Sequence, residues 1–379
     1  MTTTLAATAA TLWDAIIIGA GPAGSMLALD LTRRGLRVLL LDQSPFPRSK
    51  VCGGCLNGNA LAALTRLRLA DLPMQLGGQP IRSLLLGAQG CTANLSLDAS
   101  VSISRLAFDA ALTEHCVRAG VTFQCGVRAS MENAGDDFSR VILRSAAESV
   151  GVKGRIAILA HGLKAGAIAP HSRIGAGVIL AESPAGYPAS TISLAVGKNG
   201  YVGAVQVEEG RFDLAAAFDA KFVQESGSLG HAAAQVLRQA GFPAIPELEH
   251  APWRGTPFLT RRPKRIAGQR WFAVGDAAGY VEPFTGEGMA WAMSGALALA
   301  PIVSRAVADW DDAHARLWTQ LHARLIRRRQ LQCRVLAKVL RSERLSSWMV
   351  RLLALCPTFA VPFVHNLSRP TTRFRGVAS

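Results

Sequence analysis

The chain of 379 residues has few aromatic side chains, few cysteines and fewer acidic than basic side chains. No run of eighteen apolar residues occurs, so a membrane-spanning helix is not expected. Seven irregularly spaced cysteines do not form a disulfide framework, which favours a reducing, cytoplasmic location. Residues 1–11 lack the positive charge and apolar core of a signal peptide. No nucleic-acid-binding motif is found, so we expect no nucleic acid as partner.

Positive charge is the most uneven feature of the sequence. Lys and Arg outnumber Asp and Glu by 41 to 26, which gives a net charge of +15. Residues 301–379 contain 14 basic and 4 acidic residues, so +10 of this charge lies in the last fifth of the chain. Such a region suits an anionic membrane surface or an acidic partner.

A dinucleotide-binding pattern opens the chain. Residues 13–18 form a β-branched apolar run typical of a buried parallel strand, and Gly19-Ala20-Gly21-Pro22-Ala23-Gly24 follows at once. A helix is predicted over 22–34, and a second strand over 37–41 ends at Asp42. The glycines allow a pyrophosphate to approach the backbone at a helix N-terminus, and the acid suits a ribose hydroxyl.

A second strand–turn–helix pattern lies far along the chain. The strand is predicted over 270–274, the turn at Gly275-Asp276-Ala277-Ala278-Gly279 and a small-residue helix over 286–300. Between turn and helix lies Pro283-Phe284-Thr285-Gly286-Glu287-Gly288-Met289. A helix N-terminus here would stabilise negative charge on a reduced flavin ring.

With Arg105 in Ser104-Arg105-Leu106-Ala107-Phe108-Asp109, these two turns make the sequence resemble a known flavoprotein family. The family contains FAD-dependent aromatic hydroxylases, flavin halogenases and geranylgeranyl reductases. The resemblance implies that Asp42 binds the adenosine ribose, that Arg105 lies along the FAD and that Asp276 binds the ribityl chain. The predicted cofactor-binding residues are Gly19, Gly21, Ala23, Gly24, Asp42, Arg105, Val127, Gly275, Asp276, Gly286, Gly288 and Met289.

The segment Lys50-Val51-Cys52-Gly53-Gly54-Cys55 resembles the geranylgeranyl reductase branch, where it lies beside the flavin ring. Small residues there would admit substrate to the ring face, and a thiol with a shifted pKa could act as an acid. Cys52 and Cys55 also have the spacing of a redox disulfide or of half a zinc site. No second pair follows, so no metal site is predicted.

Two departures from the family pattern limit this assignment. His161-Gly162 stands where many hydroxylases have Asp-Gly, which argues against direct NAD(P)H use in the hydroxylase manner. The paired tryptophans of the halogenases are missing. The aromatic substrate segment of the reductases keeps only Tyr201, in Gly200-Tyr201-Val202-Gly203-Ala204-Val205.

These patterns predict an α/β fold with a Rossmann-like FAD-binding domain and an inserted, mainly antiparallel substrate domain. The sequence also predicts a few short strands over 81–101, alternating strands at 191–196 and 201–207, and one helix near 220–240. The FAD-binding domain is assigned to 12–62, 101–171 and 264–310, and the substrate domain to 63–100 and 172–263. Residues 311–379 form a basic helical region. Two interpretations of 317–364 stay open, a basic amphipathic membrane-surface segment and a helical lid over the flavin domain.

The favoured function is reduction of a prenyl, polyketide or lipid-like substrate by hydride transfer from reduced FAD. The residues assigned to catalysis are Cys52, Gly53, Gly54 and Glu287. The alternatives are a monooxygenase that hydroxylates a lipophilic phenol or aromatic polyketide, and a non-catalytic FAD-binding protein. The electron donor, NAD(P)H or a partner protein, stays open.

Overall fold

The computed structural model describes residues 5–146, 148–163, 166–282 and 286–361. Its N-terminal unit is a β–α–β motif, in which β1 (Leu12–Ile18) and β2 (Val38–Leu41) pair in parallel through α2 (Pro22–Arg33). β2 is buried along its whole length, as a continuous apolar strand in a covered parallel sheet should be. This motif and the helices below confirm the predicted α/β class.

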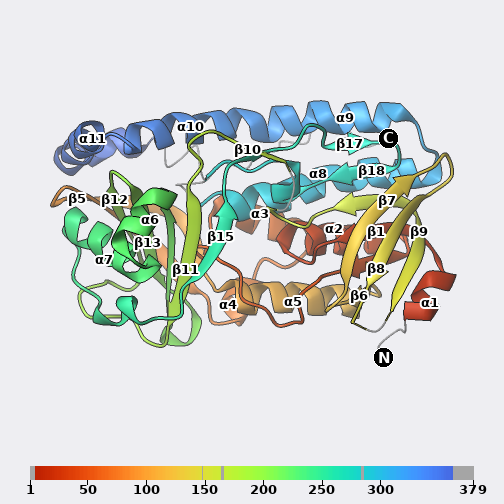
Figure 1. Cartoon of the computed structure of the whole chain (residues 1–379), viewed down its shortest axis with the longest axis horizontal. Helices are drawn as coiled ribbons and strands as arrows, with labels where there is room; N and C mark the ends of the chain where they lie inside the picture. Colours follow the sequence, from red (N-terminus) through yellow and green to blue (C-terminus); the bar gives the residue numbers. More distant parts are fainter. Residues whose placement is uncertain (1–4, 147, 164–165, 283–285, 362–379) are drawn as a thin grey trace.

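The first sheet lies at one end of the elongated molecule (Figure 1). Its core order is β18-β9-β1-β2-β6 with all pairs parallel, and antiparallel strands β17, β8 and β7 extend it. The further strands of this sheet are β6 (Thr122–Gln124), β7 (Arg128–Ala134), β8 (Ser139–Arg144), β9 (Ser149–Leu159), β17 (Ala267–Gly268) and β18 (Trp271–Ala273). A separate short pair joins β10 (Ala167–Ile168) to β16 (Arg261–Arg262).

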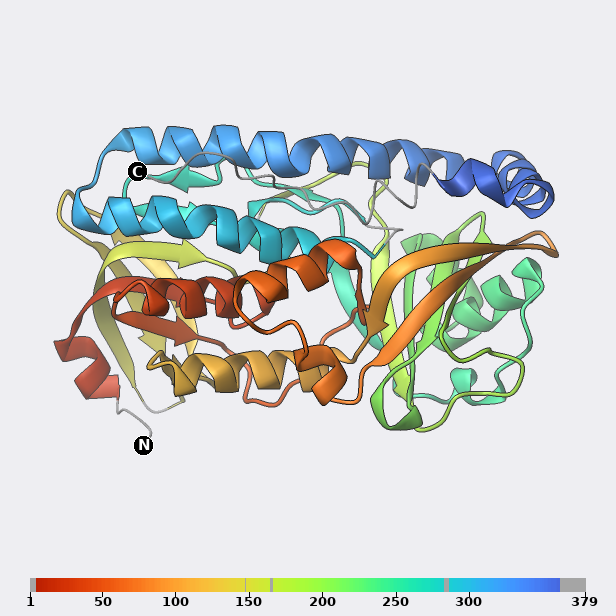
Figure 2. The ribbon, with the colours of Figure 1, turned by 180° about the vertical axis from the view of Figure 1, so that it is seen from behind.

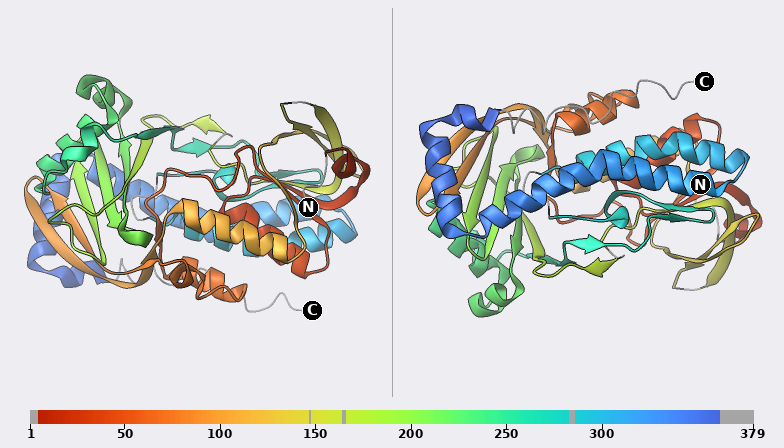
Figure 3. Two further views of the ribbon diagram at one scale, coloured as in Figure 1. Left: turned by 90° about the horizontal axis from the view of Figure 1, so that it is seen from below. Right: turned by 90° about the horizontal axis from the view of Figure 1, so that it is seen from above.

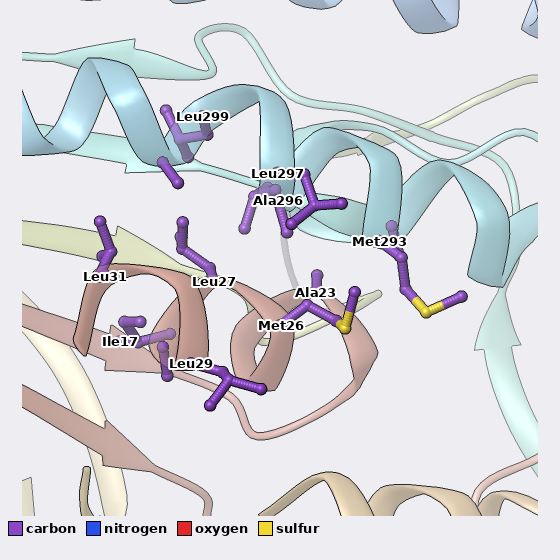
Figure 4. Close-up of a cluster of buried hydrophobic side chains, with 14 of the residues drawn as sticks. Ile17, Ala23, Met26, Leu27, Leu29, Leu31, Met293, Ala296, Leu297 and Leu299 are labelled. Atoms are coloured by element: carbon purple, nitrogen blue, oxygen red, sulfur yellow. The ribbon is translucent and has the colours of Figure 1, made fainter. Parts of the chain in front are cut away.

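The core of this end is formed by α2 against α8 (Gly288–Ala308). Figure 4 shows Met26 and Leu27 of α2 facing Met293, Ala296 and Leu297 of α8. α8 is long and apolar enough to cross a membrane. However, 72% of its apolar stretch is buried inside the protein, as in the core helix of a folded domain. Its small residues instead allow close packing of two helices over the sheet.

The second sheet lies at the other end, on the right in Figure 2 and below the C-terminal helices in that view. Its order is β15-β11-β14-β13-β12-β4-β5-β3, and only β12 and β4 pair in parallel. The strands are β3 (Cys55–Leu56), β4 (Gln79–Ala88), β5 (Cys91–Ser102), β11 (Ile174–Leu180), β12 (Thr191–Gly197), β13 (Gly200–Gln206), β14 (Phe212–Phe218) and β15 (Arg254–Phe258). The apolar alternation of residues 81–101 therefore belongs to one long hairpin, turned at Gln89-Gly90, and not to several short strands.

Two elements, β3 and α3, lie at or across the predicted boundary between the two domains. β3 lies within 12–62 yet pairs with β5 of the second sheet, and α3 (Gly58–Arg66) crosses the 62/63 boundary and packs on α8. The predicted domain bounds stay a prediction. The single helix expected over 220–240 is two, α6 (Ala220–Ser226) and α7 (Leu229–Ala240), because Gly227 adopts φ +81° and Ser228 caps the second helix.

The C-terminal helices run along the length of the molecule over α8 and end above the second sheet (Figure 3, right). They are α9 (Asp312–His322), a π-helical turn η4 (Ala323–Arg327), α10 (Arg328–Leu340), α11 (Glu343–Leu355) and the turn η5 (Pro357–Ala360). The remaining helices and turns are α1 (Leu5–Ala10), α4 (Leu72–Gln75), α5 (Arg105–Arg118), η1 (Glu208–Gly210), η2 (Pro246–Glu249) and η3 (Gly275–Ala278).

Candidate cofactor and substrate site

The two glycine turns predicted from the sequence lie against each other. A methyl group added at Gly275 would lie 2.9 Å from Ala23 Cβ, so the η3 turn touches the start of α2. A methyl group at Gly24 would lie 1.9 Å from the Gly19 carbonyl oxygen, which explains the glycine where α2 crosses the end of β1. The fold thus brings both predicted cofactor segments to one place.

Asp42 lies at the end of β2, where the sequence predicts the ribose-binding acid. Its Oδ2 accepts a hydrogen bond from the Ala20 backbone N–H at 3.0 Å, and its Oδ1 accepts one from the Ser44 N–H at 2.9 Å. Arg48 Nη2 lies 3.3 Å from Oδ2. A carboxylate has about four acceptor positions, so the group retains capacity for a sugar hydroxyl in the adjoining cavity.

Arg105 and Arg48 place two guanidinium groups at the first glycine turn. Arg105 makes a bidentate pair with the buried Asp109 at 2.7 Å, and Arg48 reaches the same carboxylate at 3.1 Å. A methyl group at Gly21 would meet only these two guanidiniums, at 3.5 and 3.8 Å. Asp42 and Asp109 hold the two guanidiniums beside an open backbone, where their remaining N–H groups can donate to the pyrophosphate of FAD.

Asp276 of the second turn lies near the oppositely charged side chain of Lys50, and each shifts the pKa of the other. Burial lowers the pKa of the Lys50 ammonium, and the neighbouring Arg105 lowers it further, whereas Asp276 raises it. Burial raises the pKa of the Asp276 carboxyl, an effect that Lys50 and Arg105 oppose. A methyl group at Gly162 would lie 3.8 Å from Lys50 Nζ, so the His161-Gly162 pair also borders this group.

The predicted substrate-side segment lies between these charges and the second sheet. Cys52 and Gly53 line the cavity, and a methyl group at Gly53 would meet only Ala215 Cβ, at 3.7 Å. Gly54 faces away, with φ +60° and the Ile103 carbonyl oxygen 2.8 Å from the position of an added methyl group. Gly53 therefore leaves space for a ligand. Gly54 is a glycine because of its positive φ angle and the nearby Ile103 carbonyl group.

The cysteines are free thiols. Burial raises the pKa of Cys52, although Arg105 opposes this, and burial also raises the pKa of Cys55. The neutral thiol is the form that a proton donor needs, and it is a poor nucleophile for disulfide chemistry. Among the described residues no cluster of three or more metal-binding side chains is found.

Glu287 lies between two residues of the cavity wall, Gly286 and Gly288, and its role at the flavin ring stays a prediction. It is buried at the start of α8, where its Oε1 lies 3.0 Å from Arg329 Nη1 of α10 and its Oε2 accepts from Cys333 Sγ at 3.7 Å. It is not among the residues that line the cavity. The pair joins α8 to the C-terminal helices. The neighbouring residues 283–285 lie outside the described residues.

A cavity of about 940 Å³ borders both glycine turns, Asp42, Arg48, Lys50, Cys52, Gly53, Arg105 and Asp276. From the glycine turns it continues between the second sheet and the C-terminal helices, where its walls are apolar. These walls include Leu84, Leu86, Leu95, Leu97, Ile192, Leu194, Leu336, Met349, Leu352, Leu353 and Phe359. Cys55 lines the cavity and pairs with Ser102 of β5, and Leu95 lies seven residues further along that strand, so these two lining residues are roughly 20 Å apart.

Two tyrosines stand between the polar and the apolar parts of the cavity. Tyr201 is hydrogen-bonded to the buried Glu282, whose Oε1 lies 3.3 Å from Arg173 Nη1. Burial raises the pKa of both Tyr201 and Tyr280 well above the usual value, and Glu282 raises that of Tyr201 further. Both hydroxyls are therefore protonated at neutral pH.

Most of the predicted cofactor residues line this cavity. They are Gly19, Gly21, Ala23, Asp42, Arg105, Val127, Gly275, Asp276, Gly286, Gly288 and Met289, whereas Gly24 lies behind the turn. The roles assigned to them stay predictions. Sequence reasoning missed Arg48, Lys50, Asp109 and Tyr280. The i,i+4 spacing of Arg105 and Asp109 on one helix was a signal for that pair.

A family model described as "FAD dependent oxidoreductase" matches residues 14–90. The menaquinone reductase of Mycolicibacterium smegmatis is 45% identical over 58 residues, which are 15% of this chain and 14% of that protein. The digeranylgeranylglycerophospholipid reductase 1 of Methanothermobacter thermautotrophicus is 25% identical over 332 residues, 80% of each chain.

The fold is also that of a solved flavoprotein. A triple mutant of the flavin-dependent brominase Bmp2 has a TM-score of 0.78, with 17% identity over 94% of both chains. The glycine turns, the guanidinium pair and the matching family model agree on the cofactor, which is FAD. By these similarities the chain is an FAD-dependent oxidoreductase, similar in sequence to a geranylgeranyl-type reductase and in fold to flavin-dependent halogenases.

Proposed function

We propose that this FAD-dependent oxidoreductase reduces a lipophilic, chain-like substrate of the prenyl, polyketide or lipid-like class. One observation carries the proposal: the cavity is continuous from the phosphate-binding turn to the apolar face of the second sheet. A chain-like molecule fits a cavity that spans roughly 20 Å and is apolar at its far end better than a compact polar one does. The digeranylgeranylglycerophospholipid reductase, which aligns over 80% of each chain, supports the same substrate class.

One group of residues binds the charged parts of the cofactor, and another leaves space for the substrate. FAD, when bound and reduced, supplies a hydride. Arg48 and Arg105 neutralise phosphate charge, and Asp42 orients the ribose. Cys52 and Gly53 leave space for the substrate beside the cofactor.

Reduction of a carbon–carbon double bond needs one proton for each hydride, and the cavity offers donors. Tyr201 and Tyr280 border the apolar part and are held in the protonated form. Arg173, behind Tyr201, would stabilise the tyrosinate that remains after proton donation, and the Glu282 carboxyl, whose pKa is raised by burial, would restore its proton. Cys52 is a second candidate donor on the cofactor side.

The experiment is an anaerobic half-reaction. The FAD-loaded protein is reduced with dithionite and mixed with a menaquinone or with an unsaturated prenyl lipid, and the flavin absorbance is followed. Rapid reoxidation with formation of the reduced lipid supports the proposal. A Gly53→Ala variant should slow this step while FAD stays bound, because the added methyl group projects into open space.

The two alternatives give different results. If the reduced protein reacts only with oxygen and converts a lipophilic phenol into a hydroxylated product, the protein is a monooxygenase. If no acceptor reoxidises the flavin faster than it reoxidises free in solution, a non-catalytic FAD-binding role is correct. Bleaching by NADPH or NADH alone, measured in the same apparatus, identifies the electron donor.

A further inference from the structure

One face of α11 presents apolar side chains to solvent. Leu345, Trp348, Leu352 and Leu355 follow the i, i+3, i+7, i+10 spacing of a single helical stripe. Trp348 is 74% exposed and Leu355 is 82% exposed. Phe359 of η5 continues the stripe with 64% exposure. We call these five residues the α11 patch.

The α11 patch is continuous with the interior of the protein. Leu352 and Phe359 are exposed and also line the cavity, together with the half-buried Met349 and Leu353 on the inner side of the helix. α11 packs across β4 and β5, and Ala360 contacts Leu95 of β5. Through Leu352 and Phe359 the patch therefore borders the apolar part of the cavity, at the end far from the glycine turns.

Basic side chains border the patch. Arg344 and Arg351 lie on the same half of α11 at helical spacing, are exposed, and make no ion pair within the described part of the chain. Between 328 and 361 there are seven Lys or Arg residues and a single acid, Glu343. An apolar stripe with Trp, flanked by arginines, matches the interface of a bilayer that carries anionic lipids.

We propose that α11 and η5 dock on an anionic lipid surface, and that a lipophilic substrate enters the cavity from that surface between Leu352 and Phe359. This narrows the basic region 317–364 to one helix and one turn; of the stretch predicted from the sequence, residues 362–364 lie outside the described residues. The entry route rests on the proposed lipophilic substrate. The docking itself does not, because it needs no turnover.

The test is co-sedimentation of the FAD-loaded protein with vesicles of phosphatidylcholine mixed with phosphatidylglycerol, compared with vesicles of phosphatidylcholine alone. We expect tighter binding to the mixed vesicles and weakening by salt. Trp348→Ser/Leu355→Ser should weaken binding about tenfold or more, and Arg344→Gln/Arg351→Gln should remove the preference for the anionic lipid. All four side chains are exposed, so the variants should fold.

The matched control is Met74→Ser/Val117→Ser, which removes two exposed apolar side chains on α4 and α5 and should bind like the unmodified protein. The proposal is overturned if the unmodified protein does not bind vesicles, or if the α11 variants bind as tightly as the control. A dimer that forms without lipid and is lost in Trp348→Ser/Leu355→Ser would instead assign the patch to a second copy of the chain.

Substrate entry is tested separately from docking and from reduction. The anaerobic reoxidation is run with acceptor embedded in vesicles and with acceptor dissolved in detergent. Entry from the surface predicts that the α11 variants are slowed only with vesicle-embedded acceptor. Equal slowing in both media overturns the entry route, whereas failure of the unmodified protein in detergent overturns the reductase function and leaves the docking result standing.

Discussion

At the scale of single residues, Arg105 has the strongest effect on the cofactor site. It combines a bidentate bond to the buried Asp109 with a position 3.5 Å from where a methyl group added at Gly21 would lie. Hydrogen bonds to charged groups contribute about 1.5–3 kcal/mol each. We therefore expect Arg105→Gln to weaken FAD binding by about tenfold to hundredfold, measured by titrating the apoprotein with FAD.

Arg118→Gln is the control for this measurement, since Arg118 lies on the same helix but pairs with Glu114 at the surface. It should leave FAD affinity unchanged. Arg105→Lys keeps the charge and loses the bidentate geometry, so an intermediate affinity is expected. If Arg105→Gln binds FAD as tightly as the unmodified protein does, the guanidinium only stabilises α5 through its bond to Asp109.

His322 predicts a pH dependence of stability. It is buried against Trp318 at the end of α9, and burial lowers its pKa from 6.5 to about 4. Because the unfolded chain takes up the proton first, stability is full above pH 6.5 and falls as the pH drops towards 4. At 1.36 kcal/mol per pKa unit this loss is about 3 kcal/mol.

His322→Gln should remove this part of the acid sensitivity. The unfolding free energy is measured with guanidinium at pH 7 and at pH 4.5. His250→Gln, which removes an exposed histidine, is the control for losing a histidine as such. The difference in unfolding free energy between the two pH values should shrink by about 2–3 kcal/mol in His322→Gln. An unchanged difference would mean that the imidazole is protonated in the folded protein.

At the scale of elements, the Glu287–Arg329 pair joins the start of α8 to α10, and its role can be separated from catalysis. Breaking a buried ion pair costs about 3–5 kcal/mol, whereas replacing both partners by apolar side chains is often neutral. Glu287→Gln should therefore lower the unfolding free energy by about 3 kcal/mol, and Glu287→Met/Arg329→Met should recover most of it.

The surface pair Glu114–Arg118 is the reference, because an exposed pair contributes at most about 1 kcal/mol. The reoxidation rate of the reduced flavin is measured on the same variants. If Glu287 only fastens the helices, the double variant regains both stability and rate. A double variant that is stable but slow would restore the catalytic role predicted from the sequence.

Elements were predictable where their signals are local. The run Trp13–Ile18 with its glycine turn, and the alternation in Thr191–Val196, depend only on neighbours in the sequence. The hairpin of 79–102 and the break at Gly227 were not recognised, because length and pairing depend on partner strands and on backbone angles. The pairing of β3 with the second sheet is equally non-local.

At the scale of the whole molecule, the cofactor side of the site could be predicted and the substrate side only in part. Glycine turns and acids at strand ends identify FAD through backbone geometry that the sequence states directly. The apolar walls come from β4, β5, β12 and α11, whose leucines resemble any core leucines until the fold leaves a space between them. Lys50 belongs to a segment that the sequence singles out, but its charge and that of Arg48 are placed at the site only by the fold that surrounds them.

The length of the cavity should set the length of the substrate. Leu95 lies near the mouth, against Ala360, while the reacting end of a ligand would lie beside Gly53. Affinity for isoprenoid quinones should rise with each added prenyl unit until the chain reaches Leu95. Leu95→Trp fills that end of the cavity, so its affinity should stop rising at a shorter chain, while FAD affinity and binding of the shortest quinone stay unchanged.

The measurement is a titration of the FAD-loaded protein with quinones of increasing chain length, followed by the flavin absorbance. Met74→Trp adds the same side chain at an exposed site on α4 and should keep the chain-length dependence of the unmodified protein. Each buried CH₂ group is worth about 0.8 kcal/mol, so the lost prenyl unit should cost well over tenfold in affinity. The same dependence in Leu95→Trp and Met74→Trp would place the substrate chain outside the space between β5 and α11.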